Sequence, residues 1–503
     1  MRHRQLELPL AGRDLRQTNR NEPLRPSIEL SDGGGKLPAM SFTFVDLFAG
    51  IGGFHAALSA LGGECVFASE IDAAAGRVYE TNWGLPVAGD IVELTTDRMA
   101  VPDHDVLAAG FPCQPFSKSG HQRGMAETRG TLFWNICRVL EERRPSVILL
   151  ENVRNLAGPR HRETWSTIIG TLRDLGYRVP GRPTVFSPHL LPPELGGRPQ
   201  VRERVFIAGT YVGADRAWAE ASDAPTVPHA PVGHWDPHAW RVAEHLPLEA
   251  ETAMRDRAPY ALSAAEENWI SIWDELVVAL RRDLRGGRLP GFPIWADDFM
   301  AKPLIPHGTP AWKANFLRKN SAFYVEHRGV IDPWLARHNN LADLPPSRRK
   351  LEWQAQDAES LWDTVLHFRP SGIRAKKPSY LPALVAITQT SVIGERRRRI
   401  TPREAARLQG LPDWFGFGDQ PDAATYKQLG NGVNVGAAYY VLRQHVLREG
   451  ADIGALSPGL LRQVENSAAS PDLRLQGGLP HHSSTEFSSA IDLRSRHSTP
   501  VAN

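Results

Sequence analysis

Cysteine is scarce in this sequence. Its 503 residues include three cysteines, Cys65, Cys113 and Cys137, and no two of them form a Cys-X-X-Cys pair. A disulfide framework or a structural zinc site needs paired or clustered cysteines, so this pattern argues against both. We therefore expect no metal site and a reducing compartment.

Long apolar runs and an excess of charge are also absent. Arg2 and Arg4 are followed by no apolar stretch of signal-peptide length, and no stretch is long enough to span a membrane. With 58 Lys and Arg against 56 Asp and Glu, the net charge identifies no partner, and any nucleic-acid surface must be a local patch. We expect a cytoplasmic monomer with no membrane contact.

The order of short apolar segments predicts the fold. Residues 1–40 are polar and are expected to form a flexible tail. From residue 41 to 210 apolar strands alternate with helical segments, and strands are expected at 42–48, 64–69, 105–109, 147–150 and 204–209. This alternation predicts an α/β fold, a doubly wound and mostly parallel sheet with helices on both faces.

The pattern changes in the second half of the chain. Residues 211–394 are rich in Trp, Pro and His, and we expect them to form a second, smaller domain. Thr401-Pro402-Arg403-Glu404 is typical of a helix start, and Gly410 of its end. We expect 395–450 to return to the first domain and the Ser-, Gly- and Arg-rich residues 451–503 to be a disordered tail.

A glycine-rich turn follows the first expected strand. Residues 44–54 have the sequence FVDLFAGIGGF, and their glycines would let a ligand approach the backbone. The spacing is not GxGxxG, so a pyrophosphate site is not required. Glu70 ends the second strand, where a carboxylate can hold the ribose hydroxyls of any adenosine cofactor, NAD included. Asp90 is placed to accept a hydrogen bond from an adenine amino group.

Cys113 differs from the other two cysteines in its setting. Residues 110–117, GFPCQPFS, directly follow an expected strand, at the carboxyl edge where ligands bind in open α/β folds. A cysteine between prolines on such a loop indicates a nucleophilic thiol, whose pKa local positive charge should lower. We interpret Cys65 and Cys137 as small buried apolar residues.

Six motifs stand in the order found in the DNA cytosine-5 methyltransferases, a family that this sequence resembles over about residues 42–210 and 395–445. They are residues 44–54, 110–117, 151–153 (ENV), 200–204 (QVRER), 399–405 (RITPREA) and 428–433 (QLGNGV). The resemblance implies the class I S-adenosylmethionine-dependent methyltransferase fold. It also implies methylation of carbon 5 of cytosine in DNA, as in prokaryotic restriction-modification systems.

The same resemblance assigns roles to residues. Cys113 would add to carbon 6 of a flipped cytosine, Glu151 would hold ring nitrogen 3 and the amino group, and Arg202 and Arg204 would hold the carbonyl and support the thiolate. The expected contacts to S-adenosyl-L-methionine are Phe48, Gly50, Ile51, Gly53, Glu70, Ile71, Asp90, Ile91, Pro112, Leu132, Asn431 and Val433. Gly432 stands where many members have Ser, and it offers no side-chain hydrogen bond to the cofactor.

Two further regions are expected to meet double-stranded DNA. The glycines and basic residues of 118–130 resemble the family's mobile catalytic loop, with a plain surface loop as the alternative. Residues 211–394 stand where the family carries its target-recognition domain, and within them we expect 371–378 to contact DNA. The predicted DNA-binding residues are Ser117, Arg374, Lys376 and Lys377. Ala383-Leu384 stands where many relatives have Thr-Leu, so the alignment there is weaker.

Several other side chains of this region could have either a structural role or a role in DNA binding. We interpret Tyr324, Trp334, Trp353 and Phe368 as core residues in preference to stacking platforms for bases. The Arg396–Arg399 run either binds the DNA backbone or is a basic lead into the next helix, and the sequence favours neither.

Three other functions are alternatives to this one. The tRNA-methylating branch of the same family is disfavoured by the large insertion, and a silent DNA-binding homologue by the intact Cys113, Glu151 and Arg204. An NAD-dependent dehydrogenase would leave residues 110–117 without a role. A restriction endonuclease acting on the same DNA site is a candidate partner.

Overall fold

The computed structural model describes residues 41–96, 98–112, 132–250, 258–284, 288–356, 358–384 and 390–477. Several predicted features lie outside the described residues: the flexible tail 1–40, Cys113, Ser117, the segment 118–130 and residues 478–503. Among the described helices, none is long and apolar enough to cross a membrane.

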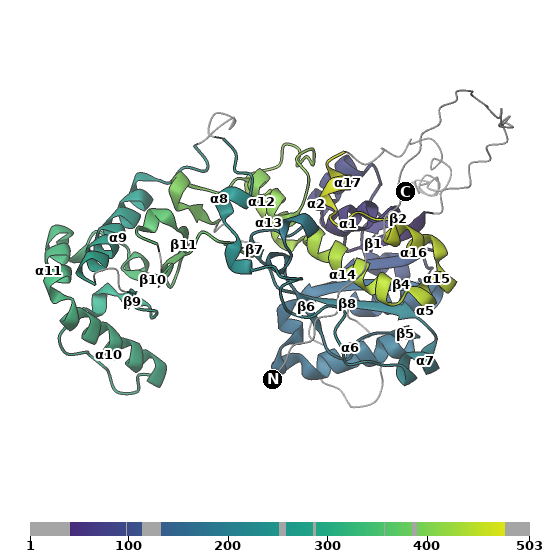
Figure 1. Cartoon of the computed structure of the whole chain (residues 1–503), viewed down its shortest axis with the longest axis horizontal. Helices are drawn as coiled ribbons and strands as arrows, with labels where there is room; N and C mark the ends of the chain where they lie inside the picture. The colour runs from purple at the N-terminus through teal and green to yellow at the C-terminus, as the bar shows by residue number, and fades with distance from the viewer. Residues whose placement is uncertain are drawn as a thin grey trace, which may run out of the picture. The chain divides into compact units, whose positions relative to one another are not determined.

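A seven-stranded sheet forms the centre of the first part of the chain (Figure 1). Its strands are β1 (Phe42–Leu47), β2 (Gly63–Ser69), β3 (Val106–Gly110), β4 (Val147–Val153), β5 (Tyr177–Arg178), β6 (Thr184–Phe186) and β8 (Arg204–Tyr211). They lie in the order β2-β1-β3-β4-β8-β5, with β6 also beside β8. The first four strands pair in parallel, as predicted.

Strand β8 runs antiparallel to β4, β5 and β6, so the sheet is parallel only in its first half. After β6 the chain stays at the carboxyl edge of the sheet until β8 begins at Arg204. The first residue of β8 therefore lies opposite Val153, at the end of β4. This reversal brings an arginine to the edge where the parallel strands end.

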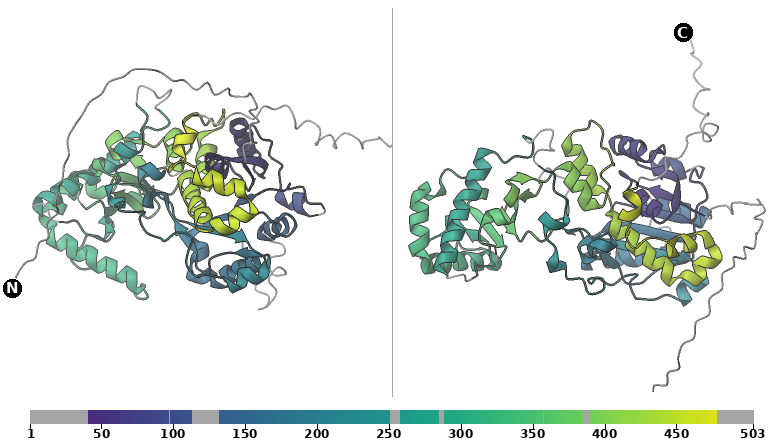
Figure 2. Two further views of the ribbon diagram at one scale, coloured as in Figure 1. Left: turned by 45° about the vertical axis from the view of Figure 1, so that its right-hand side comes forward. Right: turned by 45° about the horizontal axis from the view of Figure 1, so that its top comes forward.

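Alternate strand residues face two separate hydrophobic cores, with helices on both faces of the sheet (Figure 2). Phe44 and Val106 pack into the core that holds α1 (Gly53–Ala60) and α14 (Val435–Arg448). Val45 and Leu107 pack into the core that holds α5 (Leu132–Arg143) and α6 (Arg162–Asp174). The predicted doubly wound α/β fold is confirmed. Several further helices belong to this part of the fold. They are α2 (Ala73–Trp83), α3 (Ile91–Thr95), α7 (Ala214–Ala219), α8 (Val242–His245), α12 (Pro402–Gln409) and α13 (Asp422–Asn431).

A second sheet has a hydrophobic core of its own, formed by residues between Leu262 and Val392. Its strands are β9 (Ile294–Trp295), β10 (Lys350–Gln354), β11 (Val365–Arg369), β12 (Gly372–Lys376), β14 (Val392–Ile393) and β15 (Arg398–Arg399), and its helices are α9 (Ala264–Asp283), α10 (Ala311–Glu326) and α11 (Arg328–Arg337). Trp334, Trp353 and Tyr324 are buried in this core and Phe368 packs against it, which confirms their interpretation as core residues. The limits 211–394 of a separate domain stay a prediction.

Residues 450–475 form three helices, α15 (Gly450–Leu456), α16 (Pro458–Glu465) and α17 (Asp472–Leu475). The prediction of disorder is therefore wrong for this part of the expected tail. Ile453, Leu460 and Val464 are fully buried in the core that also holds β1 and α14. A few apolar residues at helical spacing supply this burial within a stretch whose composition is mostly polar.

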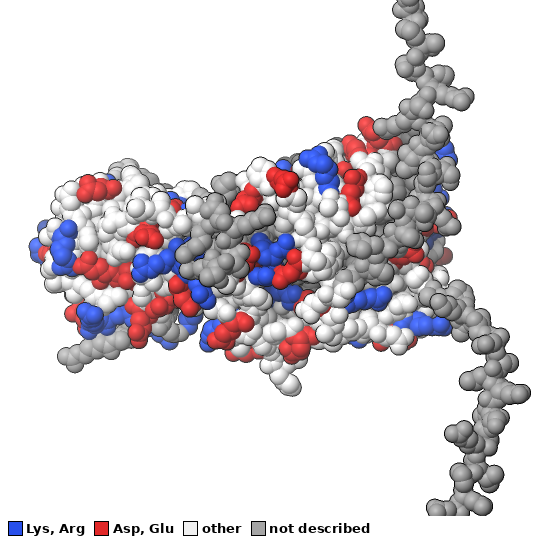
Figure 3. Space-filling model, turned by 90° about the horizontal axis from the view of Figure 1, so that it is seen from above, with Lys and Arg blue, Asp and Glu red and all other residues white. Residues whose placement is uncertain are grey.

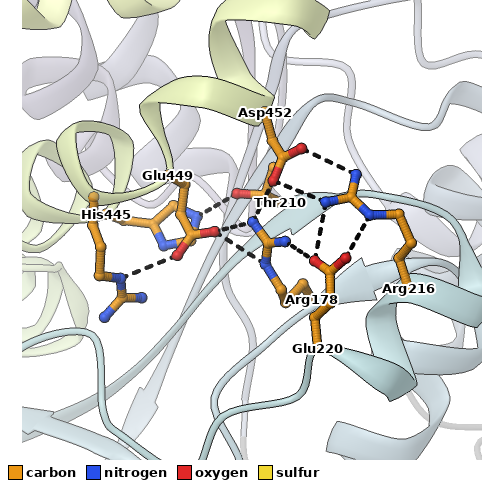
Figure 4. A network of polar contacts seen from close by, with 8 residues as sticks. Arg178, Thr210, Arg216, Glu220, His445, Glu449 and Asp452 are labelled. Carbon is orange, nitrogen blue, oxygen red and sulfur yellow. Dashed lines mark hydrogen bonds and ion pairs between the residues drawn. The ribbon is translucent and has the colours of Figure 1, made fainter.

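A network of ion pairs joins the first of these helices, α15, to the edge of the first sheet (Figure 4). Arg178 of β5 donates hydrogen bonds to Glu220, Glu449 and Asp452, and Arg216 pairs with Glu220 and Asp452. Burial alone would raise the pKa of Glu449, but its contacts with Arg178 hold it below its ordinary value. The network thus favours the order of α15 over a free tail.

The predicted helix start at Thr401 is confirmed. The Thr401 hydroxyl accepts a hydrogen bond from the backbone N–H of Glu404, whose carboxylate accepts the N–H of Thr401. The Glu404 carboxylate also pairs with the buried Arg398, while Arg399 pairs with Glu266. These contacts favour a structural role for Arg398 and Arg399 over binding of the DNA backbone, whereas Arg396 and Arg397 are exposed.

Candidate active site

A cavity of about 480 Å³ opens where the parallel strands of the first sheet end. Its walls come from the loops after β1 to β4, from the start of β8 and from the end of α13. Ten of the twelve predicted cofactor contacts line it: Phe48, Gly50, Glu70, Ile71, Asp90, Ile91, Pro112, Leu132, Asn431 and Val433. Glu151 and Arg204, predicted to be catalytic, line the same cavity.

The glycine-rich turn is held by close contacts behind the cavity. A Cβ added to Gly53 would lie 2.7 Å from the carbonyl oxygen of Val433, so only glycine fits there. The carbonyl of Ile51 accepts a hydrogen bond from Trp83 Nε1 at 3.0 Å. Gly53 and Ile51, the two predicted contacts that do not line the cavity, therefore shape the turn that does.

Glu70 and Asp90 each bind the protein and keep acceptor capacity. Glu70 accepts the backbone N–H groups of Gly50 and Asp72, both at 2.8 Å, one on each carboxylate oxygen. Asp90 caps α3 by accepting the N–H of Val92 at 2.9 Å. A carboxylate offers about four lone-pair sites, so each group can accept further hydrogen bonds from a ligand.

Glu151 lies at the end of β4, directly opposite Gly110 of β3. Its side chain is buried, and Oε1 lies 3.0 Å from Nε of Arg204. Burial raises the pKa of Glu151 above its ordinary value, although the charges of Arg204 and Arg202 oppose this shift. The carboxyl group therefore keeps its proton to a higher pH than an exposed glutamate does.

Asn152 holds the chain at Phe111, two residues before the predicted nucleophile. Its buried side-chain amide donates a 2.8 Å hydrogen bond to the carbonyl of Phe111. Pro112, the next residue, lines the cavity, and the following residue is the predicted nucleophile. The structure thus brings Glu151, Arg204 and the residues just before Cys113 to one edge of the sheet.

Arg202 lies elsewhere. It was expected to hold the cytosine carbonyl, but its side chain is buried and does not line the cavity. Its Nη2 donates to the carbonyl oxygens of Gly430, at 2.9 Å, and Gly432. The two arginines do not share a strand: Arg202 lies in the connection after β7 (Gln200–Val201), and Arg204 is the first residue of β8. The alternation of a single strand, which would put residues two apart on the same face, therefore does not apply to them.

Sequence reasoning missed one side of the cavity. Lys427 of α13 and Asp72, the N-cap of α2, both line it and form an ion pair at 3.4 Å. Gln428 and Val153 line it as well. Lys427 and Asp72 are 355 residues apart in the sequence, so no local spacing could have joined them.

A second, smaller cavity of about 200 Å³ carries the predicted DNA-binding residues Arg374 and Lys376, and we call it the basic pocket. Its lining residues are His367, Arg369, Arg374, Lys376, Pro382, Ala383, Leu384, Thr390, Ser391 and Tyr426. Arg374 is paired with Glu352, whereas the exposed Lys377 does not line the pocket. Burial and the neighbouring Arg374 and Arg369 lower the pKa of Lys376.

Two cysteines take the predicted structural role. Cys65 and Cys137 are buried, and burial raises the pKa of both thiols. A thiol that resists ionisation is a poor nucleophile, so neither residue is a rival to Cys113.

Comparisons with known proteins show which family the chain belongs to. The family described as C-5 cytosine-specific DNA methylase matches residues 42–447. The chain belongs to this family. The Type II methyltransferase M.AluI of Cellulosimicrobium cellulans is 47% identical, over 82% of this chain and 93% of that protein. M.HpaII of Haemophilus parainfluenzae is 30% identical, over 79% and 87%.

A solved structure of the Dnmt2 methyltransferase of S. pombe is 17% identical and covers 81% of this chain and 99% of that chain, with a TM-score of 0.44. Membership of the cytosine-5 methylase family makes the chain a DNA methyltransferase of the S-adenosylmethionine-dependent class. It acts on carbon 5 of cytosine, and the predicted enzyme class is confirmed.

For this methyltransferase, replacing Glu151 with Gln should change stability in a pH-dependent way. Because its pKa is raised in the folded state, ionising Glu151 opposes folding, and wild type should lose stability relative to Glu151→Gln as pH rises from 4.5 through the folded-state pKa. The ion pair with Arg204 does not reverse this trend, because the charge of Arg204 already contributes to the folded-state pKa, which stays above the ordinary value. Denaturant unfolding at a series of pH values measures the difference, and a flat difference would mean that Glu151 titrates normally.

Proposed function

We propose that the enzyme flips a target cytosine out of a duplex site, adds the Cys113 thiolate to carbon 6 and methylates carbon 5. The observation that carries this proposal is the convergence of Glu151, Arg204 and Pro112 on the rim of one cavity. Pro112 immediately precedes Cys113. A base stacked inside a duplex cannot reach a thiol at a sheet edge, so the base must leave the helix.

The residues fit S-adenosyl-L-methionine as the cofactor of the 480 Å³ cavity. A Cβ built on Gly50 would meet nothing within 4 Å, so the turn leaves open space beside its backbone. Glu70 can accept the ribose hydroxyls and Asp90 the adenine amino group, while the exposed side chains of Ile71 and Val92 offer apolar surface to a flat ring. When bound, this cofactor supplies an electrophilic methyl group.

Three side chains of the protein, Cys113, Glu151 and Arg204, then carry out the covalent and proton-transfer steps. Addition of the Cys113 thiolate breaks the 5,6 double bond and makes carbon 5 nucleophilic, and protonated Glu151 donates to ring nitrogen 3 and offsets the charge that develops there. Arg204 holds Glu151 in place. After methyl transfer, a base removes the carbon-5 proton and the thiolate leaves carbon 6, which restores the double bond, and ring nitrogen 3 returns its proton to Glu151.

A duplex that carries 5-fluorocytosine at the target site tests this chemistry. Fluorine on carbon 5 cannot leave as a proton does, so the methylated base should stay bonded to Cys113 through denaturing electrophoresis, and only when S-adenosylmethionine is present. Cys113→Ser should give no adduct, because a hydroxyl supplies almost no anion at neutral pH.

The other outcomes separate the alternatives. An adduct that maps to Cys65 or Cys137 would mean that Cys113 is not the nucleophile. An adduct on tRNA instead of duplex DNA would favour the tRNA-methylating branch. Carbon-5 methylation without any adduct would overturn the covalent mechanism.

Glu70→Ala should weaken binding of S-adenosylmethionine by about 1.5–3 kcal/mol, the contribution of hydrogen bonds to a charged group. Loss of the carboxylate removes the ribose acceptor and also frees the N–H of Gly50. Titration calorimetry measures the affinity, with Glu93→Ala as the matched control, because Glu93 is exposed on α3 and does not line the cavity. Unchanged affinity in folded Glu70→Ala would remove Glu70 from the site.

We also propose that duplex DNA meets the second sheet at the basic pocket. His367 lies opposite Arg374 and Val365 opposite Lys376 on neighbouring strands, so His367, Arg374 and Lys376 share one face of the sheet. The other face packs on the hydrophobic core through Leu366 and Ile373. The face that Figure 3 shows carries basic and acidic side chains interspersed, so a local group of cations is needed to select DNA.

Replacing Lys376 and Lys377 with Ala should weaken binding of duplex DNA and flatten its salt dependence, because each phosphate that a lysine no longer neutralises lowers the slope by about 0.9. The two single variants form a matched pair, because Lys376 lines the basic pocket and Lys377 does not. Fluorescence anisotropy over a salt series measures both. If Lys377→Ala accounts for the whole effect, the pocket is not where DNA binds.

The two relatives described above are named Type II methyltransferases. Their names support the further proposal that a restriction endonuclease acts on the same DNA site, and that methylation protects host DNA from it.

A further inference from the structure

The buried guanidinium of Arg202 holds the end of helix α13. Its Nη2 donates to the carbonyl oxygens of Gly430 and Gly432, which stand on either side of Asn431, the last residue of the helix. The last carbonyl groups of a helix have no partner within it, and a cation there also interacts favourably with the helix dipole. Gly430, Asn431 and Gly432 all line the cofactor cavity.

The same segment of chain holds a wall of the basic pocket. Gln200 and Val201 pair in parallel with Leu381 and Pro382, strands β7 and β13 (Leu381–Pro382). Arg202 Nη1 reaches the carbonyl oxygen of Leu384 at 3.5 Å. Pro382 and Leu384 line the basic pocket, so residues 200–202 touch the walls of both cavities.

Helix α13 also has residues in both cavities. Tyr426 lines the basic pocket, whereas Lys427 and Gln428, the next two residues, line the cofactor cavity. The hydroxyl of Tyr426 donates to the carbonyl of Ile400 at 2.6 Å, which fixes the helix at this point. A shift of α13 would therefore change both cavities at once.

We propose that Arg202 is a positioning residue that couples cofactor binding to DNA binding. It holds α13 and residues 382–384 in the one arrangement in which both cavities are formed. Each ligand that stabilises this arrangement raises the affinity for the other, and thermodynamic linkage makes the effect reciprocal. This proposal rests on the proposed function, which places the cofactor in one cavity and DNA at the other.

The test is a binding cycle on the full chain. The affinity for S-adenosylhomocysteine, a non-reactive probe, is measured by calorimetry with and without a saturating pool of random-sequence duplex DNA, and the ratio is the coupling factor. Couplings of this kind are typically about 5- to 150-fold. Arg202→Lys should bring the factor close to one, because an ammonium keeps the charge but cannot span several carbonyl groups as a planar guanidinium does.

Arg178→Lys is the matched control. It replaces a partly buried arginine that also joins distant parts of the chain, in the network of Figure 4, but lines neither cavity. It should lower stability and leave the coupling factor unchanged. If Arg202→Lys does not fold, Ser187→Ala replaces it, because the Ser187 hydroxyl accepts the backbone N–H of Arg202 and its removal should lower the factor in part.

The outcomes are distinct. A wild-type coupling factor of one, or a factor that Arg202→Lys leaves intact, would overturn the proposal while both ligands still bind. A wild type that binds neither probe would overturn the proposed function, and this inference with it. Equal reductions in Arg202→Lys and Arg178→Lys would reduce the role of Arg202 to general stability.

Discussion

The approach of Gly53 to Val433 is the contact on which the active-site cavity depends. Two stretches that are far apart in the sequence meet here: the turn after β1 and the loop between α13 and α14. A single added carbon at Gly53 would lie 2.7 Å from both the Cγ1 atom and the carbonyl oxygen of Val433. Because the gap admits no side chain, the turn and the loop can close one cavity between them, and the packing of α1 against α14 keeps them together.

The carboxylates of the cavity show how such a site is kept ready for its ligands. Glu70 and Asp90 are fixed by backbone N–H groups before any ligand arrives, so binding need not order them. Glu151 is fixed by Arg204 instead, at the cost of burying a carboxyl group whose ionisation opposes folding. Buried groups with shifted pKa values, whose ionisation lowers the stability of the fold, are typical of active sites.

Local patterns in the sequence predicted the parts of the fold that depend on neighbours in the chain. The parallel strands, the capping box at Thr401 and the places of Glu70 and Asp90 in the cavity follow from such patterns. The features that the sequence could not predict depend on contacts between residues far apart in the chain. The reversal of β8, the ion pair of Lys427 with Asp72, the burial of Arg202 and the order of α15 to α17 all arise from tertiary contacts, and two arginines two residues apart look alike in a motif.

The charges of the basic pocket bear on the proposed binding of DNA there. Arg369, Arg374 and Lys376 repel one another, while Glu352 forms an ion pair with Arg374 and offsets part of the repulsion at Lys376. A crowded group of this kind lowers stability unless a ligand rich in acceptors relieves it. The net charge of +2 and the mixed signs on the face in Figure 3 supply no strong overall attraction to a polyanion, so the local group of cations matters more. If DNA binds there as we propose, cations held by a sheet would fix the register of the duplex, and contacts to the bases would supply the specificity.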